Sequence, residues 1–418
     1  MKNLELIRAA AKAYEAGDLS AAEEKLRASI ELDERNGVAQ NNLANLLRIS
    51  GRFDEAVAHY RLALRAHPGS AGIRSNLAGA LEELGQYDLA EAEYRAAVRL
   101  DPDFAEARFN LALLLLASGN YTDGWVYYEA RESVFRDYGA LPFPKWNGED
   151  LRGKSLLLLT EQGYGDAIQF CRYIALLRER GVATVTIACK PELAPLLRTT
   201  GNIDHVVTDP QSLHMHDYWI SLLSLPQRFN TTVDSIPANV PYLGVFGNRI
   251  DAWRPRLPAD GLRVGLVWKG NPGHDNDAHR SVRHFAELAP LWSVPGIEYI
   301  SLQVGEAEAE CEGRETQQPI LRLGRDIRDF ADTAAIVAQL NLVICVDTAI
   351  AHLAGALGIA CWLMLPGRGV DWRWHRLGTT SPWYPEKMFL FRQDARGWPG
   401  VIDDVTRALS DIVRQRNA

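Results

Sequence analysis

The sequence has few cysteines, no long apolar run and no tryptophan in its first 124 residues. Its five cysteines are scattered among 418 residues without a CxxC pair, which is typical of reduced, buried thiols in a cytosolic protein. No apolar run approaches the roughly 20 residues that a membrane span needs. Charged residues interrupt the amino-terminal stretch, so we expect no signal peptide and a cytoplasmic protein.

The charge is also unremarkable, with a net value of −8 and no basic stripe. We therefore expect no nucleic-acid partner. With 47% hydrophobic and 23% charged residues the chain is globular, and its length predicts two or three domains at about 150 residues each. All eleven tryptophans lie from Trp125 onward, and only Pro68 and Pro102 of the twenty prolines precede it. This asymmetry indicates two architectures in one chain.

The front part is a repeat with a period of 34 residues. Glycine recurs at this spacing, at Gly17, Gly51, Gly85 and Gly119. Alanine does the same, at Ala10, Ala44, Ala78 and Ala112. Apolar residues between these marks follow the i, i+3, i+4 spacing of amphipathic helices, so each unit is expected to be two short helices joined near the glycine.

This pattern resembles the tetratricopeptide repeat. Three full units fit, at about 3–36, 37–70 and 71–104, and a degenerate fourth begins at 105. In that fourth unit Gly124 and Arg131 stand where alanines are expected. We therefore predict an all-α repeat superhelix over 1–130, followed by a linker over 131–150.

Three asparagines share the same spacing, at Asn42, Asn76 and Asn110. In stacked repeats this register places their amides in one row, where they can hold an extended peptide backbone through donors and acceptors. A similar asparagine ladder occurs in the repeats of O-linked N-acetylglucosamine transferase, where it binds protein acceptors. The alternative is that these asparagines only cap or space neighbouring repeats.

From Leu151 onward, short apolar strands alternate with helices, which predicts parallel sheets. We expect one α/β lobe over 151–255 and a second over 256–418, joined through the Pro-rich stretch 230–258. The strands of the first lobe are expected at 155–160, 182–188, 205–208 and 217–222, and those of the second at 263–268, 297–302, 342–346 and 361–365. Helices are expected at 167–180 and, at the chain's end, at 401–413, where the last one packs back onto the first lobe. Ligands of such sheets bind at the carboxyl ends of their strands.

The segment Val346–Gly355 carries the clearest chemical signal, because a strand runs directly into Asp347 and Thr348 and then into a helix of small residues. Free amides at such a helix start suit a diphosphate, and His352 follows one turn later. The alternative is a helix cap with a core histidine.

This segment resembles the D-T-G/A-x-x-H-L motif of heptosyltransferase-like glycosyltransferases, family 9. Four further segments match the subgroup of that family that is fused to tetratricopeptide repeats: Gly163–Asp166, the WxGNP run at 268–272, DFADTAAI at 329–336 and SPWYP at 381–385. The resemblance covers nearly all of 151–400. It implies a GT-B fold, which is two Rossmann-like lobes with a cleft between them, and transfer of a sugar from a nucleotide-sugar donor.

The resemblance also implies residue roles. Asp166 takes the place of the proposed general base, although it also suits the cap of the helix that follows. The donor is expected to contact Lys269, Asn271, Arg280, Ser281, Gln303, Asp347, Thr348, Ala349 and His352. The acceptor is expected to contact the loop Gln162, Gly163, Tyr164 and Gly165, together with the asparagine row.

Two points in this set stay open. Relatives often bind the diphosphate through a lysine, so either Lys269 or Arg280 is the cation. Asp275, Asn276 and Asp277 resemble the metal-binding DxD of the other glycosyltransferase fold, but a GT-B site needs no metal, and we interpret them as a solvated loop. We expect no metal and no cofactor besides the donor substrate.

The function that these features favour is metal-independent, inverting O-glycosylation of a protein Ser or Thr, with flagellin or another surface protein as one acceptor. Two alternatives remain. One is a lipopolysaccharide or exopolysaccharide glycosyltransferase whose repeats recruit a partner. The other is a repeat scaffold whose transferase half is inactive.

Overall fold

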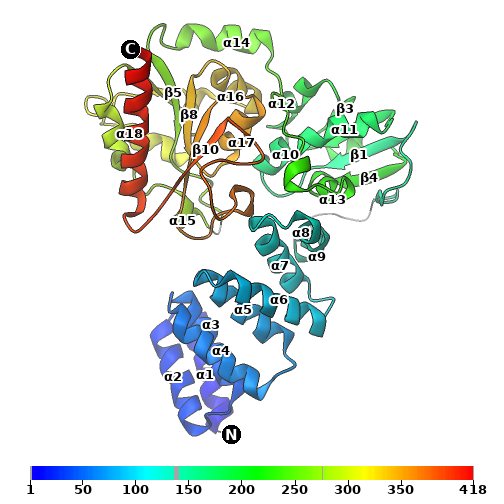
Figure 1. Ribbon diagram of the computed structural model, residues 1–418, viewed down its shortest axis with the longest axis vertical. Helices are drawn as coiled ribbons and strands as arrows, with labels where there is room; N and C mark the ends of the chain where they lie inside the picture. The colour runs from blue at the N-terminus through cyan, green and yellow to red at the C-terminus, as the bar shows by residue number, and fades with distance from the viewer. Residues whose placement is uncertain (1, 136–140, 275, 418) are drawn as a thin grey trace. The chain divides into compact units, whose positions relative to one another are not determined.

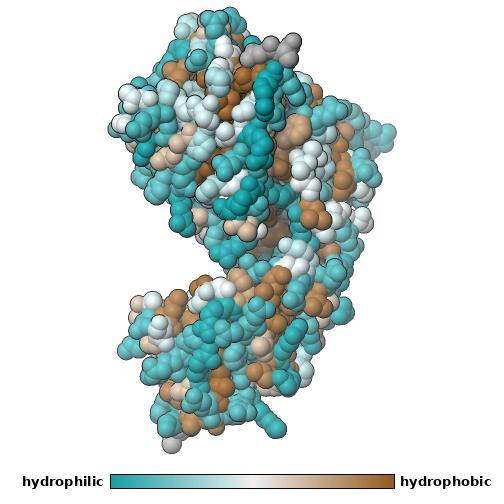
Figure 2. Space-filling view, turned by 60° about the vertical axis from the view of Figure 1, so that its left-hand side comes forward, coloured by the Kyte–Doolittle hydropathy of each residue, from teal (hydrophilic) through white to brown (hydrophobic). Residues whose placement is uncertain are grey.

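The computed structural model describes residues 2–135, 141–274 and 276–417. The chain divides into two compact units, residues 1–138 and 139–418 (Figure 1). The first is built from helices and the second from two parallel sheets with helices around them. In the view of Figure 2, hydrophilic residues cover most of the surface of each unit.

The first unit consists of helix pairs at the predicted period. Its helices are α1 (Lys2–Glu15), α2 (Leu19–Leu32), α3 (Gly37–Ile49), α4 (Phe53–Ala66), α5 (Ala71–Glu83), α6 (Tyr87–Leu100), α7 (Ala105–Ala117), α8 (Tyr121–Tyr128) and α9 (Arg131–Phe135). The two helices of each pair are joined at Gly17, Gly51, Gly85 and Gly119, with φ of 77°, 75°, 70° and 83°. Only glycine adopts this left-handed conformation without strain, which explains the 34-residue spacing.

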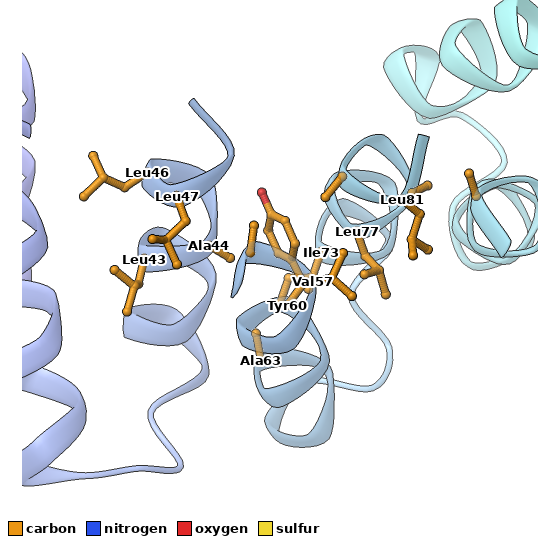
Figure 3. Packing of buried hydrophobic residues seen from close by; sticks show 14 of the residues in the cluster. Leu43, Ala44, Leu46, Leu47, Val57, Tyr60, Ala63, Ile73, Leu77 and Leu81 are labelled. Atoms are coloured by element: carbon orange, nitrogen blue, oxygen red, sulfur yellow. The ribbon is translucent and has the colours of Figure 1, made fainter. Parts of the chain in front are cut away.

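Small and medium-sized side chains fill the core of the repeats. Figure 3 shows Leu43 and Leu47 of α3, Tyr60 of α4 and Leu77 of α5 in one packed cluster. Ala44, like the alanines at the equivalent positions, is fully buried. The repeat interior therefore leaves no room for tryptophan, which accounts for its absence from the three full units.

The fourth unit departs from the others, as predicted. Helix α8 has eight residues, whereas α2, α4 and α6 have fourteen each. A Cβ at Gly124 would lie 2.7 Å from Leu116 Cδ2, so the glycine lets α8 approach α7 closely. Arg131 is fully buried; it donates to Glu129 Oε1 at 2.8 Å and lies over the Tyr128 ring. A buried guanidinium in place of alanine ends the regular lattice here.

The first lobe of the second unit is a four-stranded parallel sheet in the order β3-β2-β1-β4. Its strands are β1 (Ser155–Leu159), β2 (Thr184–Ala188), β3 (His205–Val207) and β4 (Tyr218–Ser221). Its helices are α10 (Tyr164–Phe170), α11 (Ile174–Glu179), α12 (Ala194–Leu197) and α13 (Leu225–Arg228). The predicted helix over 167–180 is thus two α-helices, joined by a 3₁₀ turn at Cys171–Tyr173.

The second lobe is a six-stranded parallel sheet in the order β10-β9-β8-β5-β6-β7. Its strands are β5 (Leu262–Val267), β6 (Ile297–Ser301), β7 (Leu321–Arg322), β8 (Leu342–Val346), β9 (Cys361–Leu365) and β10 (Met388–Arg392). Its helices are α14 (Gly247–Trp253), α15 (Asp277–Arg280), α16 (Phe330–Val337), α17 (Ala349–Ala356) and α18 (Gly397–Asn417), with 3₁₀ helices η7 (Phe285–Ser293), η8 (Glu306–Cys311) and η10 (Trp372–Trp374). Numbered from β5, this is the strand order of the dinucleotide-binding fold. A repeat superhelix followed by two Rossmann-like lobes is the predicted fold class, and the structure confirms it.

Some elements differ from the prediction. Strands β7 and β10 were not predicted. Helix α18 packs on the second lobe rather than on the first, because Trp398, Val401 and Leu409 share a core with Phe285 and Leu288 of η7. In Figure 1 this helix lies beside β5, across the second lobe from β1 and β4. All five cysteines are buried and free, as expected.

The α7–α8 contact makes a test of the degenerate repeat. Gly124→Ala should destabilise it by about 1–3 kcal/mol, because the added methyl meets a buried leucine. Amide hydrogen exchange over 105–128 in the full chain should then speed up about tenfold, at roughly 1.4 kcal/mol per factor of ten. Gly72→Ala in α5 is the control: its Cβ meets nothing within 4 Å, so unchanged or slower exchange is expected. Equal behaviour of the two variants would contradict the close-packing account.

Candidate functional site

The switch point of the second sheet lies between β5 and β8, the neighbouring strands at which the strand order reverses. Crevices at such points bind nucleotides, at the carboxyl ends of the strands. The loop after β5 contains Lys269, Asn271, Arg280 and Ser281, and Asp347 and Thr348 follow β8 directly. The fold thus brings two groups of predicted donor residues to one sheet edge.

Asp347 and Thr348 form the junction between β8 and α17. Thr348 is the N-cap of α17 but makes no side-chain cap hydrogen bond, and its buried Oγ1 has no partner among the described residues. Burial, and next the charge of Asp371, raise the pKa of Asp347 to about 7. The junction therefore combines an unused hydroxyl, the open amides of a helix start and a carboxyl group that titrates near neutrality.

The loop after β5 is tightly folded around its glycine. A Cβ at Gly270 would lie 2.6 Å from Asp277 Oδ1 and 2.7 Å from Arg280 Nη2. Ser281 Oγ accepts from the Gly270 amide and donates to Asp277 Oδ1, both at 2.9 Å. Arg280 Nε pairs with Asp277 at 3.3 Å. Asn271 Oδ1 accepts from the Gly273 amide at 3.0 Å.

The two candidate cations, Arg280 and Lys269, have different charged neighbours. Arg280 lies close enough to Asp347 for its charge to lower the pKa of that carboxyl, against the effect of burial. Lys269 Nζ is paired with Glu310 Oε1, and the other Glu310 oxygen accepts from the Phe285 amide. Of these two residues, Arg280 is therefore the one whose charge acts on Asp347.

Gln303 follows β6 and is almost fully buried. Its Oε1 accepts from the amides of Trp268 and Lys269 at 3.1 and 3.0 Å. Its Nε2 donates to the carbonyls of Lys269 and Val304, both at 3.2 Å. The side-chain amide thus braces the backbone at the end of β5, and its contact with the donor stays a prediction.

His352 is held in an aromatic environment on α17. Its Nδ1 lies 3.0 Å from Tyr384 Oη, and its ring stacks on Trp374 with centroids 5.1 Å apart. Burial, and then the positive charges of Arg373 and Arg172, keep its pKa well below the usual value. The imidazole is therefore neutral near pH 7.

In the first lobe, the loop after β1 holds the predicted base. Gln162 has a left-handed backbone with φ of 58°. Asp166 Oδ2 accepts from the Gly163 amide at 2.7 Å and so caps α10, as the alternative for this residue predicted. Its other oxygen, Oδ1, accepts from Arg373 of the second lobe. Tyr164 contacts the ring of Phe330 in α16, with centroids 4.9 Å apart.

The first-lobe loop and the Asp347–His352 segment meet at Gly165. A Cβ there would lie 2.8 Å from His352 Cδ2 and 3.5 Å from Ala349 Cα. Only a residue without a side chain allows this approach of α10 to α17. Because Asp166 follows Gly165 directly and Ala349 is the first residue of α17, this contact brings Asp166 and the start of α17 into the same interlobe region.

The asparagine row lies on the first helix of each repeat, at Asn42 of α3, Asn76 of α5 and Asn110 of α7, each half-buried. Asn42 and Asn76 line one pocket of about 400 Å³ together with Tyr14, Asn45 and Arg48. Its remaining lining is apolar, at Ala10, Ala11, Ala22, Leu26, Leu46 and Ile49. Asn110 does not line this pocket.

Sequence reasoning missed three charged residues of the interlobe region. Arg373 belongs to an aromatic and basic stretch, 371–375, whose sequence indicates at most stacking on a base or sugar. Arg172 is buried and donates to the Trp383 carbonyl at 2.7 Å. Glu161 is buried and accepts from Ser221 Oγ. Partners 60 to 211 residues apart in the chain leave no periodic signal, so only the fold reveals them.

From their place in the DFADTAAI segment, Asp332 and Thr333 are also candidates to contact the ribose or base of the donor. Asp332 Oδ1 instead accepts from Arg249 Nη1 at 2.5 Å and from Trp253 Nε1 at 3.0 Å, which ties α14 to α16. Thr333 Oγ1 donates to the Asp329 carbonyl at 3.3 Å. Asp275 lies outside the described residues.

Comparison with known families supports the front part directly. Two profiles described as tetratricopeptide repeat match residues 7–71 and 47–99, and one described as TPR repeat matches 80–119. Residues 7–119 are tetratricopeptide repeats. A tetratricopeptide repeat protein from Parabacteroides merdae is similar, with 27% identity, a TM-score of 0.30, and coverage of 33% of this chain and 55% of that one.

Protein FlbA of Caulobacter vibrioides is 29% identical over 320 residues, which are 69% of this chain. The chain spans about half (52%) of the length of that relative.

Two further solved structures are similar to this chain. The family 9 glycosyl transferase from Veillonella parvula shares 13% identity at a TM-score of 0.45, covering 59% of this chain and 88% of that one. An O-GlcNAc transferase mutant from Thermobaculum terrenum shares 15% identity at a TM-score of 0.35, covering 99% and 92%. The assignment of the two-lobed fold rests on the strand orders given above.

No helix within 2–135, 141–274 or 276–417 is both long and apolar enough to cross a membrane. In those same ranges, no three His, Cys, Asp or Glu side chains gather as a metal site would require.

The raised pKa of Asp347 makes stability depend on pH. Its folded pKa of about 7 exceeds the ordinary 3.8, so ionised Asp347 destabilises the native state, increasingly between pH 4 and 7 and fully above. Asp347→Asn should therefore stabilise the protein at pH 8, by on the order of 2–4 kcal/mol, and have little effect at pH 4. Thermal unfolding across this range measures the difference.

Asp217 is the control of opposite sign. Its pKa is lowered to about 2 by hydrogen bonds from the Ser155 amide and hydroxyl and from Lys154. Asp217→Asn should cost stability at pH 8 and progressively less below pH 4. A pH-independent effect of Asp347→Asn would contradict a desolvated carboxyl at this position.

Proposed function

We propose that this protein is a glycosyltransferase that moves a sugar from a nucleotide sugar to a Ser or Thr hydroxyl of a polypeptide held by its repeats. The reaction is inverting and needs no metal, and it takes place in the cytoplasm. The observation that carries the proposal is the close approach at Gly165, where the loop with Asp166 meets the start of α17. This contact supports the proposal because it brings together the segments, from opposite lobes, to which we assign the base and the diphosphate site.

The chemistry follows from these two sites. Asp166 takes the proton of the acceptor hydroxyl as the oxygen lone pair forms a bond to the anomeric carbon. The bond between that carbon and the diphosphate oxygen breaks on the opposite face, and the nucleoside diphosphate leaves with the electron pair. Amides at the start of α17, the Thr348 hydroxyl and Arg280 stabilise the negative charge that develops there.

The environment of each cation supports Arg280 rather than Lys269 as the diphosphate clamp. Both cations have a carboxylate partner, Asp277 for Arg280 and Glu310 for Lys269, but Arg280 also acts on Asp347 at the switch point. A guanidinium also binds phosphate oxygens in a bidentate way, which an ammonium does not.

The repeat pocket supports a peptide acceptor. Asn42 and Asn76 present amide donors and acceptors beside apolar lining residues, and such amides can pair with the carbonyls and amides of an extended backbone. Flagellin or another surface protein is the acceptor that the family resemblance implies.

Asp166→Asn tests the catalytic assignment. It should lower kcat by about 10²–10⁴-fold, because it removes the proton acceptor, while the donor still binds. Transfer is assayed with a panel of UDP-, GDP-, ADP- and CDP-linked sugars.

Arg280→Ala should instead weaken donor binding about tenfold or more, and Lys269→Ala should leave donor binding nearly unchanged. Wild-type protein that binds no nucleotide sugar in calorimetry would be a scaffold, which ends the proposal.

Removing the asparagine row tests the acceptor assignment. The triple change of Asn42, Asn76 and Asn110 to Ala should raise KM for a random-sequence, serine-containing peptide library at least tenfold, because several backbone hydrogen bonds are lost at about 1 kcal/mol each. Hydrolysis of the donor should be unaffected. Gln86→Ala, an exposed amide at the start of α6 without a cap hydrogen bond, is the control. An unchanged KM in the triple variant would exclude the row from peptide binding.

A further inference from the structure

Arg373 connects the two lobes through charged and polar contacts. It lies in η10 of the second lobe, and only 6% of its side chain is exposed. From the first lobe, Asp166 accepts from its Nη2 and Gln169 Oε1 accepts from its Nε at 2.5 Å. On its own lobe, Nη1 donates to both oxygens of Asp371, at 3.0 and 3.1 Å.

This arrangement fixes the carboxylate of Asp166 at both oxygens. Oδ1 is bound by Arg373, and Oδ2 by the Gly163 amide at 2.7 Å. The guanidinium itself cannot turn freely, because it lies against the rings of Phe170 and Trp372, 5.5 and 4.4 Å from their centroids. A planar, permanently charged group held on several sides is well suited to orient a carboxylate.

Resting on the function proposed above, we further propose that Arg373 is the positioning residue for Asp166, and that Asp371 competes with Asp166 for its charge. Arg373 keeps Asp166 ionised and oriented at the interlobe contact. Asp371 weakens that hold, so that Asp166 remains basic enough to accept the proton of the acceptor hydroxyl.

The contributions to the pKa of Asp166 have the signs that this proposal requires. Burial raises its pKa most, Arg373 and the Gly163 amide lower it, and Asp371 and Glu161 raise it. These are the charged groups around it: Arg373 and Asp371 from the region of η10, and Glu161 from the loop before α10. The titratable group that faces this loop from α17 is His352, which is neutral near pH 7. Removing Arg373 must therefore raise the pKa of Asp166, and removing the charge of Asp371 must lower it.

Arg172 offers a matched control. It is also buried and also crosses between the lobes. Its hydrogen bonds, however, go to neutral groups, among them the Trp383 carbonyl and the Tyr242 hydroxyl at 2.7 and 2.9 Å, and no carboxylate within the described residues forms an ion pair with it. Loss of Arg172 removes interlobe packing without removing the ion pair of Asp166.

The experiment follows the titration of Asp166 in the full chain by the ¹³Cγ resonance of labelled aspartate, assigned with Asp166→Asn. This readout needs no donor or acceptor. Compared with wild type, Arg373→Gln should move the midpoint up and Asp371→Asn should move it down, each by about one pH unit or more. Arg172→Gln should leave the midpoint where it is. Arg373→Lys should restore it in part, because the charge remains without the planar fork.

Opposite displacements cannot arise from a loss of packing, which would affect all variants in the same way. Midpoints that coincide in the wild type, Arg373→Gln and Asp371→Asn would overturn the proposal. If Arg373→Gln does not fold, Asp371→Asn and Arg373→Lys decide it by the same criterion.

The outcome is separable from that of the proposed function. With a donor that supports transfer, the acidic limb of kcat/KM against pH should move with the same signs in the same variants. An Asp347→Asn background removes the second carboxyl whose pKa is shifted by Arg373 and Asp371. If the protein transfers sugar but neither the acidic limb nor the Asp166 midpoint moves in these variants, the role of Arg373 is refuted and the proposed function stands. If the Asp166 midpoints move as expected but the protein transfers no sugar, the proposed glycosyltransferase function is refuted and the role of Arg373 in positioning Asp166 stands.

Discussion

The α/β unit depends on one close contact, where the first turn of α10 lies against the first turn of α17. Gly165 makes the contact sterically possible, and a buried guanidinium, that of Arg373, holds it together through Asp166 and Gln169. Burying a permanent positive charge is unfavourable unless carboxylates and hydrogen bonds match it. The contact is therefore specific: it fixes which loop of the first lobe faces which strand end of the second, and the placement of every candidate catalytic residue follows from it.

Much of the fold was predictable because local rules governed it. The 34-residue period is visible in the sequence since each helical hairpin needs one left-handed glycine, as at Gly51 and Gly85. Strands such as β1 and β8 were found because buried parallel strands are continuous apolar runs. The two-residue β7 is too short to produce such a run, and α18 was assigned to the wrong lobe because an amphipathic helix does not reveal which sheet it covers.

The site was predictable only as a set of loops. Asp166, Asp347 and Thr348 could be predicted because they follow expected strands, and parallel strands bring their carboxyl ends to one edge of the sheet. What the sequence could not provide is how the charges pair. Lys269 and Arg280 look equivalent as cations in the same loop. Lys269, however, pairs with Glu310 of η8, a later segment, whereas Arg280 pairs with Asp277 and also acts on Asp347. Asp166 likewise gains its partner from 207 residues away.

The charges around the β5–β8 junction constrain how a diphosphate would bind there. Each guanidinium is already matched, Arg280 by Asp277 and Arg373 by Asp371 and Asp166. An ionised Asp347 would add an unmatched negative charge where a dianionic group has to sit. Because burial raises the pKa of Asp347 to about 7, the approach of phosphate oxygens would favour its protonated form still more. In that form the carboxyl is a hydrogen-bond donor. The burial that destabilises the free protein would therefore allow Asp347 to donate to a diphosphate bound there instead of repelling it.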